Sequence, residues 1–248
     1  MCEHFAADRS YADMENELNY IDLKVPDGST MAAYISSPKN KDGKVPGIIV
    51  LQEAFGVNHH IRKVTDRFAR EGYIAIAPEL FHRTAPKGFH GNYADFNTVL
   101  PHTKALTNKG LETDLNVTFQ WLIQQDNIDT DRIFAVGYCM GGRVSFLANT
   151  LLPLKASVSY YGGGTDTIAD KAPGMHGKQL FYWGGLDRHI KPENIHAVIN
   201  AVETAGKEFM NVNISYADHG FNCDERESYN EAASKQAWAL TLAFLAEP

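Results

Sequence analysis

One short segment constrains the fold of this chain more than any other. The sequence GYCMGG at residues 137–142 directly follows the apolar run Ile133–Val136. A strand, a nucleophile between glycines and a helix, in this order, form a nucleophile elbow, here with cysteine in the usual place of serine. Glycine has no Cβ atom, so strand and helix can approach closely around a strained turn. Two alternatives remain at this point: a glycine-rich turn that binds phosphate, and a buried cysteine that only fills space.

Two later strand ends supply an acid and a base. The apolar residues 179–183 run into Asp187, and residues 212–216 run into His219. Nucleophile, acid and histidine follow one another in this order in proteins with a nucleophile elbow. The sequence therefore predicts a catalytic triad of Cys139, Asp187 and His219.

Competing assignments are weaker. Asp218 is adjacent to His219, and consecutive residues of an extended chain point in opposite directions. Asp166 follows another predicted strand end, and His189, two residues after Asp187, is more simply a loop residue. The ten histidines form no HExxH motif, so the sequence predicts no metal site and no cofactor.

Composition favours one ordinary domain. Of the 248 residues, 44% are hydrophobic and 21% are charged, with a net charge of −7. We expect a loose N-terminal extension over residues 1–15 and a single domain over residues 16–248. The acidic balance argues against nucleic acid and membranes as partners, and neither a spanning segment nor a secretory signal is visible. Three scattered cysteines do not make a disulfide framework, which suits a cytoplasmic protein. The oligomeric state stays open, a monomer included.

Strand and helix patterns alternate along the chain. Two segments, Leu18–Val25 and Met31–Ser36, flank a turn and predict an antiparallel hairpin. Further strands are predicted at residues 47–51, 73–77, 133–136, 156–160, 179–183 and 212–216, and helices around residues 61–68, 111–122, 192–205 and 229–244. This order predicts an α/β fold with a mostly parallel, doubly wound sheet and a site at the carboxyl ends of its strands. The weakly patterned residues 84–109 form either a flap over the pocket or a surface excursion.

A cysteine nucleophile needs activation, because a free thiol with a pKa of about 8.5 is only a few per cent ionised at neutral pH. His219, oriented by Asp187, is the expected base. The backbone amides of Met140 and of Ala54, in the loop after the first central strand, are the expected oxyanion donors. Glu53, a carboxylate at the end of that strand, is either a structural group with buried partners or part of the chemistry.

Four motifs together resemble the dienelactone hydrolase (carboxymethylenebutenolidase) family. They are, in order, Gln52–Gly56, Gly137–Gly142, Tyr160–Gly162 and His219–Phe221. The resemblance runs from about residue 18 to the C-terminus. It implies an α/β-hydrolase that opens an unsaturated lactone carrying a carboxylate, in bacterial degradation of catechol-type aromatic compounds.

The resemblance also implies roles for single residues. Glu53 would contact the resting thiol of Cys139 and release it when substrate binds. Arg83 would bind the substrate carboxylate, with a surface salt bridge to Glu79 as the alternative.

One family position differs in this chain. Four residues after His219, where a second arginine is expected, stands Cys223, which either lines the site or fills space. Arg226 is near in sequence but cannot be equated with the expected arginine. We expect three aromatic residues to form walls of the pocket: Tyr138, Tyr161 and Phe221. For Tyr138, packing beneath the elbow is the alternative.

These observations favour a cofactor-independent hydrolase of small lactones or esters that works through an acyl-enzyme. A general carboxylesterase or thioesterase is the main alternative. A binding protein that keeps the hydrolase fold without turnover is the other, because a fold alone does not fix a function.

Overall fold

The chain folds around one eight-stranded sheet. The structure is a computed structural model that describes residues 19–39 and 43–247. The strand order is β1-β2-β4-β3-β5-β6-β7-β8. The strands are β1 (Tyr20–Lys24), β2 (Thr30–Ser36), β3 (Val45–Leu51), β4 (Ile74–Pro78), β5 (Ile128–Tyr138), β6 (Ala156–Tyr160), β7 (Lys178–Gly184) and β8 (Phe209–Ile214). The predicted extension over residues 1–15 lies outside the described residues.

The pairing confirms the predicted topology. β1 pairs with β2 and β2 with β4 in antiparallel fashion, which forms the N-terminal hairpin and its continuation. All later pairings, from β3–β4 to β7–β8, are parallel. The central strands are almost entirely buried, as expected for a parallel sheet covered on both faces.

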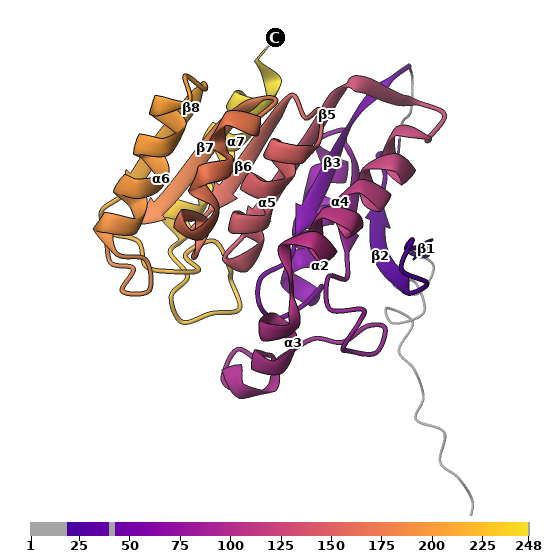
Figure 1. Cartoon of the computed structure of the whole chain (residues 1–248), viewed down its shortest axis with the longest axis horizontal. Coiled ribbons are helices and arrows are strands. Elements are labelled where there is room, and N and C mark those ends of the chain that lie inside the picture. The colour runs from indigo at the N-terminus through magenta and orange to yellow at the C-terminus, as the bar shows by residue number, and fades with distance from the viewer. Residues whose placement is uncertain (1–18, 40–42, 248) are drawn as a thin grey trace, which may run out of the picture.

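Helices cover both faces of the sheet. Figure 1 shows α4 (Asn108–Ile123), α5 (Met140–Leu151) and α6 (Pro192–Thr204) in front of the strands and α7 (Glu231–Ala246) behind them. The helix α2 (His59–Arg70) shares the face of α7, because the rings of Phe68 and Trp238 lie 4.7 Å apart. Shorter helices are η1 (Phe96–Thr98), α3 (Leu100–Ala105) and η2 (Thr165–Gly174). Among the described residues, every helix is too short or too polar to span a bilayer.

The last strand begins and ends earlier than the sequence pattern predicted. β8 pairs only with β7, from the pair Gln179–Phe209 to the pair Gly184–Ile214. Where β7 ends, β8 has no partner to continue its ladder, and Tyr216 lies in the following turn with 46% of its surface exposed. The acid and histidine loops follow the ends of these two paired strands, so they lie side by side.

The weakly patterned residues 84–109 pack against the loop after β3. Gly91 N–H donates to the carbonyl of Phe55 at 3.0 Å, and Gly56 and His90 form an isolated antiparallel bridge. Part of the segment is helical, as η1 and α3, and Val99 is completely buried. The segment is therefore anchored next to the loop that carries Glu53.

Candidate active site

Cys139 occupies the sharp turn between β5 and α5. Its backbone has φ 55° and ψ −117°, in the region that residues other than glycine rarely adopt. A Cβ on Gly137 would stand 1.8 Å from the carbonyl oxygen of Gly141, and one on Gly141 would stand 2.2 Å from the carbonyl oxygen of Leu51. The two glycines are therefore required by the close approach of the strands and the helix, and the strained turn lifts the Cys139 side chain out of the sheet.

The structure brings together the three residues predicted as a triad. His219 Nε2 lies 3.1 Å from Cys139 Sγ, and His219 Nδ1 lies 2.7 Å from Asp187 Oδ2. The second carboxylate oxygen of Asp187 accepts backbone N–H groups of His189 at 2.7 Å and Ile190 at 3.2 Å. These two amides fix the carboxylate, and the carboxylate in turn fixes the imidazole.

The competing acids do not meet the His219 ring. Asp218 Oδ1 accepts the backbone N–H of His219 at 2.6 Å and leaves the imidazole to Asp187. Asp166 Oδ2 accepts the side-chain amide of Asn194 at 2.7 Å. Of these three carboxylates, that of Asp187 is the one placed to orient the base.

The electrostatics favour a protonated imidazole beside the sulfur. Burial lowers the pKa of His219, but the charge of Cys139 and the hydrogen bond to Asp187 raise it more, to about 10. An ordinary histidine has a pKa of about 6.5. Near neutral pH, the imidazole of His219 beside the Cys139 sulfur is therefore protonated.

The two residues predicted to donate to an oxyanion belong to segments that pack against each other. Met140 is the first residue of α5, and the first N–H groups of a helix have no partner inside it. Met140 packs against a buried cluster that contains Ala54, Phe55 and Val99. The amide-bearing segments of Ala54 and Met140 are thus neighbours.

Glu53 is completely buried and is held by two residues that the sequence analysis did not assign to the site. Tyr93 Oη donates to Glu53 Oε2 at 2.8 Å, and Arg226 Nη1 donates to Oε1 at 3.4 Å. Within the described residues no hydrogen bond joins Glu53 to Cys139, whose sulfur instead faces His219. The contact with the resting thiol that the resemblance implied is therefore not made here, because both carboxylate oxygens have other partners.

Cys223 is part of this polar group. Its Sγ donates to Tyr93 Oη at 3.2 Å, and Asn58 Nδ2 donates to the same oxygen at 2.8 Å. Burial raises the pKa of the Cys223 thiol to about 12, and the charge of Glu53 adds to this effect. Cys223 is completely buried, so it belongs to the polar group around Tyr93 and forms no open surface.

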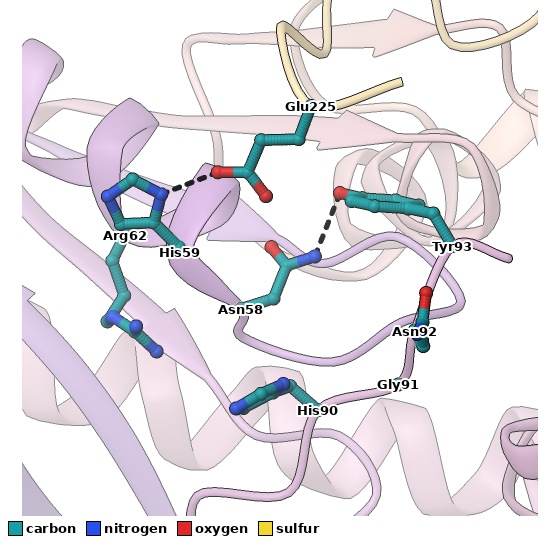
Figure 2. Close-up of a pocket in the computed structure, with 8 residues that line it drawn as sticks. All are labelled: Asn58, His59, Arg62, His90, Gly91, Asn92, Tyr93 and Glu225. Atoms are coloured by element: carbon teal, nitrogen blue, oxygen red, sulfur yellow. Dashed lines mark hydrogen bonds and ion pairs between the residues drawn. The ribbon is translucent and has the colours of Figure 1, made fainter. Parts of the chain in front are cut away.

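A cleft of about 660 Å³ opens beside His219. It is lined by Asn92, Tyr93, Ala94, His189, Asp218, His219, Glu225, Arg226, Glu227 and Ser228. A second cavity of about 380 Å³ shares Asn92, Tyr93 and Glu225 with it, so the two adjoin. Figure 2 shows Asn58 pointing at the hydroxyl of Tyr93 across this second cavity. Tyr93 thus separates the open cleft from buried Glu53.

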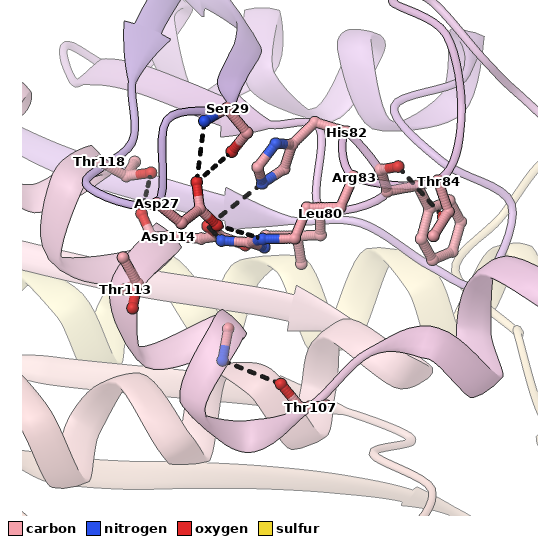
Figure 3. Close-up of polar contacts among 12 residues, drawn as sticks. Asp27, Ser29, Leu80, His82, Arg83, Thr84, Thr107, Thr113, Asp114 and Thr118 are labelled. Carbon is pink, nitrogen blue, oxygen red and sulfur yellow. Dashed lines mark hydrogen bonds and ion pairs between the residues drawn. The ribbon is translucent and has the colours of Figure 1, made fainter.

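Arg83 does not reach this cleft. Its guanidinium donates two hydrogen bonds of 2.8 Å to Asp114, which is completely buried, and one of 2.6 Å to Asp27 (Figure 3). It lines a separate small cavity with Leu80 and residues of α4. This placement corrects the prediction that Arg83 contacts the substrate, because two carboxylates already accept its hydrogen bonds. The predicted alternative, a salt bridge to Glu79, is not formed either, since the partners are Asp27 and Asp114.

The three predicted aromatic walls are completely buried. Tyr138 stacks on Tyr160 with ring centres 4.7 Å apart and packs beneath the elbow, which is the alternative given for it. The ring of Tyr161 lies 5.1 Å from that of His219, and Phe221 lies 5.2 Å from Tyr161. Tyr161 therefore packs against the imidazole, and Phe221 packs against Tyr161. Neither residue forms the surface of the cleft.

Comparisons with known proteins identify the relatives of this chain. The model of the "Dienelactone hydrolase family" matches residues 31–248. The chain is 35% identical to the Salmonella typhimurium protein named "Putative carboxymethylenebutenolidase" over 230 residues, covering 89% of this chain and 84% of that one. It is 34% identical to a Synechocystis protein of the same name, covering 84% and 88%. The crystal structure of a "Putative Dienelactone Hydrolase" from Klebsiella pneumoniae superposes with a TM-score of 0.82 at 33% identity, covering 92% and 98%.

The family model spans most of the chain, and the relatives match at this identity over most of their own length. These two findings settle the classification. The fold agrees as well, down to the N-terminal hairpin. The chain belongs to the dienelactone hydrolase family and, with it, to the enzymes that hydrolyse carboxylic esters.

Proposed function

We propose that this protein hydrolyses small lactones or esters with Cys139 as nucleophile, His219 as acid and base, and Asp187 as the group that orients His219. One observation carries the proposal. The chain of contacts from Asp187 Oδ2 through the imidazole to Cys139 Sγ is continuous, with distances of 2.7 and 3.1 Å. Nucleophile, base and orienting acid within hydrogen-bond reach are the arrangement that activates a weak nucleophile.

The reaction has two halves. The Cys139 thiolate attacks the carbonyl carbon, a C–S bond forms, and the carbonyl electron pair moves onto oxygen. The C–O bond then breaks and the leaving oxygen takes the proton of His219. In the second half neutral His219 takes a proton from water, the water oxygen attacks the thioester, and the C–S bond breaks. Thiolate and imidazolium are restored, and the carboxylic acid product loses its proton to solvent.

The amides of Met140 and Ala54 stabilise the oxyanion in both halves, each by about 3 to 4 kcal/mol. Glu53, with its carboxylate held by Tyr93 and Arg226, leaves the thiol free to pair with His219. In this role Glu53 regulates Cys139 only when these partners release it, and it does not replace Asp187.

Arg226 is the cation that favours an anionic substrate. It is one of the residues that line the cleft beside His219, and its guanidinium is 20% exposed. A carboxylate on a lactone in the cleft would compete with Glu53 for this guanidinium, with charge-assisted hydrogen bonds worth about 1.5 to 3 kcal/mol. Relatives named carboxymethylenebutenolidase act on a compound of this kind by name, which agrees with this assignment.

A substrate panel tests the proposal. Lactones and aryl esters with and without a free carboxylate are assayed with wild type, Cys139→Ala, and the matched pair Asp187→Asn and Asp218→Asn. We expect no turnover from Cys139→Ala, a fall of up to about 10⁴-fold in kcat for Asp187→Asn, and little change for Asp218→Asn. Full activity of Cys139→Ala would refute the mechanism.

The panel also tests the substrate class. Arg226→Ala should raise KM for carboxylated lactones about 10- to 100-fold, as loss of one charge-assisted hydrogen bond predicts, and leave uncharged aryl esters nearly unaffected. Equal rates on both kinds of substrate in wild type would instead indicate a general carboxylesterase, and turnover confined to thioesters would indicate a thioesterase. Binding without any turnover would indicate a binding protein.

A further inference from the structure

We propose that Glu53, His60 and Cys223 form a site for a thiophilic divalent cation such as Zn²⁺, and that the bound cation inhibits the enzyme. Among the residues that the structure describes, a carboxylate oxygen of Glu53, a ring nitrogen of His60 and Sγ of Cys223 lie within 4.8 Å of one another. All three residues are buried. Carboxylate, imidazole and thiolate are the three kinds of side chain that bind zinc in proteins.

His60 supplies the second, independent observation. It is 3% exposed, and its Nε2 has no hydrogen-bond partner within the described part of the chain. Its other ring nitrogen, Nδ1, faces Asp224 Oδ1 at 3.8 Å. A carboxylate beside one nitrogen favours the tautomer with hydrogen on that nitrogen, which leaves a lone pair on the other. Metal-binding histidines in proteins are oriented by a carboxylate in this way.

The charges of the group suit a divalent cation. A metal binds the thiolate form of Cys223, so the thiol proton leaves to solvent when the cation binds. One carboxylate and one thiolate balance the two charges of the cation, which makes a neutral buried complex. Arg226, at 3.4 Å from Glu53, is the cation that now partly neutralises this carboxylate, and it can turn toward the adjoining cleft.

The geometry requires only small movements. Zinc with bonds of about 2.0 to 2.3 Å holds tetrahedral ligands about 3.5 Å apart, so ligand atoms that lie within 4.8 Å of one another must close by about 1.3 Å at most. The hydroxyl of Tyr93 now bridges Glu53 and Cys223, at 2.8 and 3.2 Å. Since Tyr93 also lines the cleft, its side chain is the part that moves aside to admit the cation. Water from the cleft supplies the fourth ligand.

Binding of the cation does not depend on the proposed function, whereas inhibition by the cation rests on it. A cation bound at this site fixes Glu53 in one position and displaces Tyr93 into the cleft. Catalysis would then stop without any ligand on Cys139 itself.

Binding is measured first, in a protein that cannot use the catalytic thiol. The Cys139→Ala variant removes the sulfur that would otherwise bind zinc with His219. Titration with Zn²⁺ against a chromophoric chelator should give one tight site. Titration with Co²⁺ should give the charge-transfer absorption of a thiolate ligand. In the Cys139→Ala background, Cys223→Ser and His60→Gln should each weaken binding at least about 10-fold, and Cys223→Ser should abolish the absorption.

A matched control separates this site from other ligands. His59→Gln, in the same background, removes the neighbouring histidine, which is not one of the three proposed ligands, and this variant should bind Zn²⁺ as before. If Cys139→Ala binds no Zn²⁺, or if Cys223→Ser binds it equally well, the site does not exist. His60→Gln tests the same claim if Cys223→Ser fails to fold.

Inhibition is measured separately. Zn²⁺ should slow the wild type reversibly, with recovery on adding a chelator, and the inhibition constant should rise at least about 10-fold in Cys223→Ser relative to that variant's own metal-free rate. Binding without inhibition would overturn the inhibitory role and leave the site. Absence of ester hydrolysis in the metal-free wild type would instead contradict the proposed function.

Discussion

At the scale of single residues, the candidate site depends on how Cys139 and Asp187 raise the pKa of His219. Cys139 stands where most enzymes with this elbow have serine, and a thiol needs far less help to ionise. Asp187 holds the imidazole through one carboxylate oxygen, while two backbone amides hold the other. The imidazole is therefore stationary, and only its proton and the charge of the sulfur have to change during turnover.

This coupling predicts a pKa that depends on the nucleophile. Removing the sulfur in Cys139→Ala removes the largest effect that raises the pKa of His219, while burial, which lowers it, remains. We expect the pKa of His219 to fall from about 10 in the wild type toward that of an ordinary histidine. The imidazole is therefore protonated in the wild type and neutral in the variant in mildly alkaline solution.

NMR titration of the imidazole checks this prediction. Asp187→Asn should also lower the pKa of His219, because the hydrogen bond to Asp187 raises it. An unchanged His219 titration in Cys139→Ala would mean that the sulfur carries no charge in the resting enzyme.

At the scale of elements, the segment between β4 and α4 is the part whose role the sequence left open. Hydrophobic periodicity is weak over residues 84–109, and so its two short helices and its contacts were not predictable from spacing. Its path is set by long-range partners: Gly91 bonds to Phe55, and Tyr93 to Glu53 and Asn58. These contacts make the segment a wall of the cleft that also controls access to Glu53.

Tyr93→Phe tests this role. The substitution keeps the ring against Phe55, 4.6 Å away between centres, but removes the hydroxyl that bonds Glu53, Asn58 and Cys223. Buried polar groups left without a partner cost about 1 to 3 kcal/mol. A freed Glu53 carboxylate can turn toward Cys139, where its negative charge disfavours the thiolate.

We therefore expect Tyr93→Phe to lower the unfolding free energy and to slow alkylation of Cys139 by iodoacetamide, with the pH profile of alkylation displaced to higher pH. Alkylation rates against pH, with chemical denaturation of the same samples, measure both effects. Tyr229→Phe, at a tyrosine that is 39% exposed, is the matched control and should change neither. Loss of stability with an unchanged alkylation profile would make Tyr93 a purely structural residue.

At the scale of the whole molecule, local patterns predicted the fold because parallel strands are buried on both faces and read as apolar runs. The same patterns indicated three residues that are in contact in the structure, Cys139, Asp187 and His219, since each of them follows a strand end. Glu53 and His60 are near each other in the sequence, but Cys223 comes from a distant segment, so no motif could predict that the three meet. A sequence does not show which distant residues contact each other. The substrate contact expected for Arg83 illustrates this, because its partners in the structure are Asp27 and Asp114.

Arg83 joins distant parts of the chain and does not serve the cleft. It ties the loop after β4 to buried Asp114 in α4 and to Asp27 in the turn of the N-terminal hairpin, and His82 approaches the same Asp114 carboxylate at 3.2 Å (Figure 3). Removing one partner of a fully buried ion pair costs about 3 to 5 kcal/mol. Arg83 is 29% exposed, so we expect about 2 kcal/mol for Arg83→Ala, below that range because solvent screens the pair.

For a domain of this size, such a loss lowers Tm by about 4 to 8 °C. Because the donors of Arg83 are directed at Asp114 and Asp27 and not at the cleft, KM for carboxylated lactones should stay at the wild-type value. Thermal unfolding and steady-state kinetics on the same preparation measure the two effects, with Arg226→Ala as the opposite case, in which KM rises. A large rise in KM for Arg83→Ala, with Tm unchanged, would instead return Arg83 to the substrate site and require a rearrangement of its contacts with Asp114 when substrate binds.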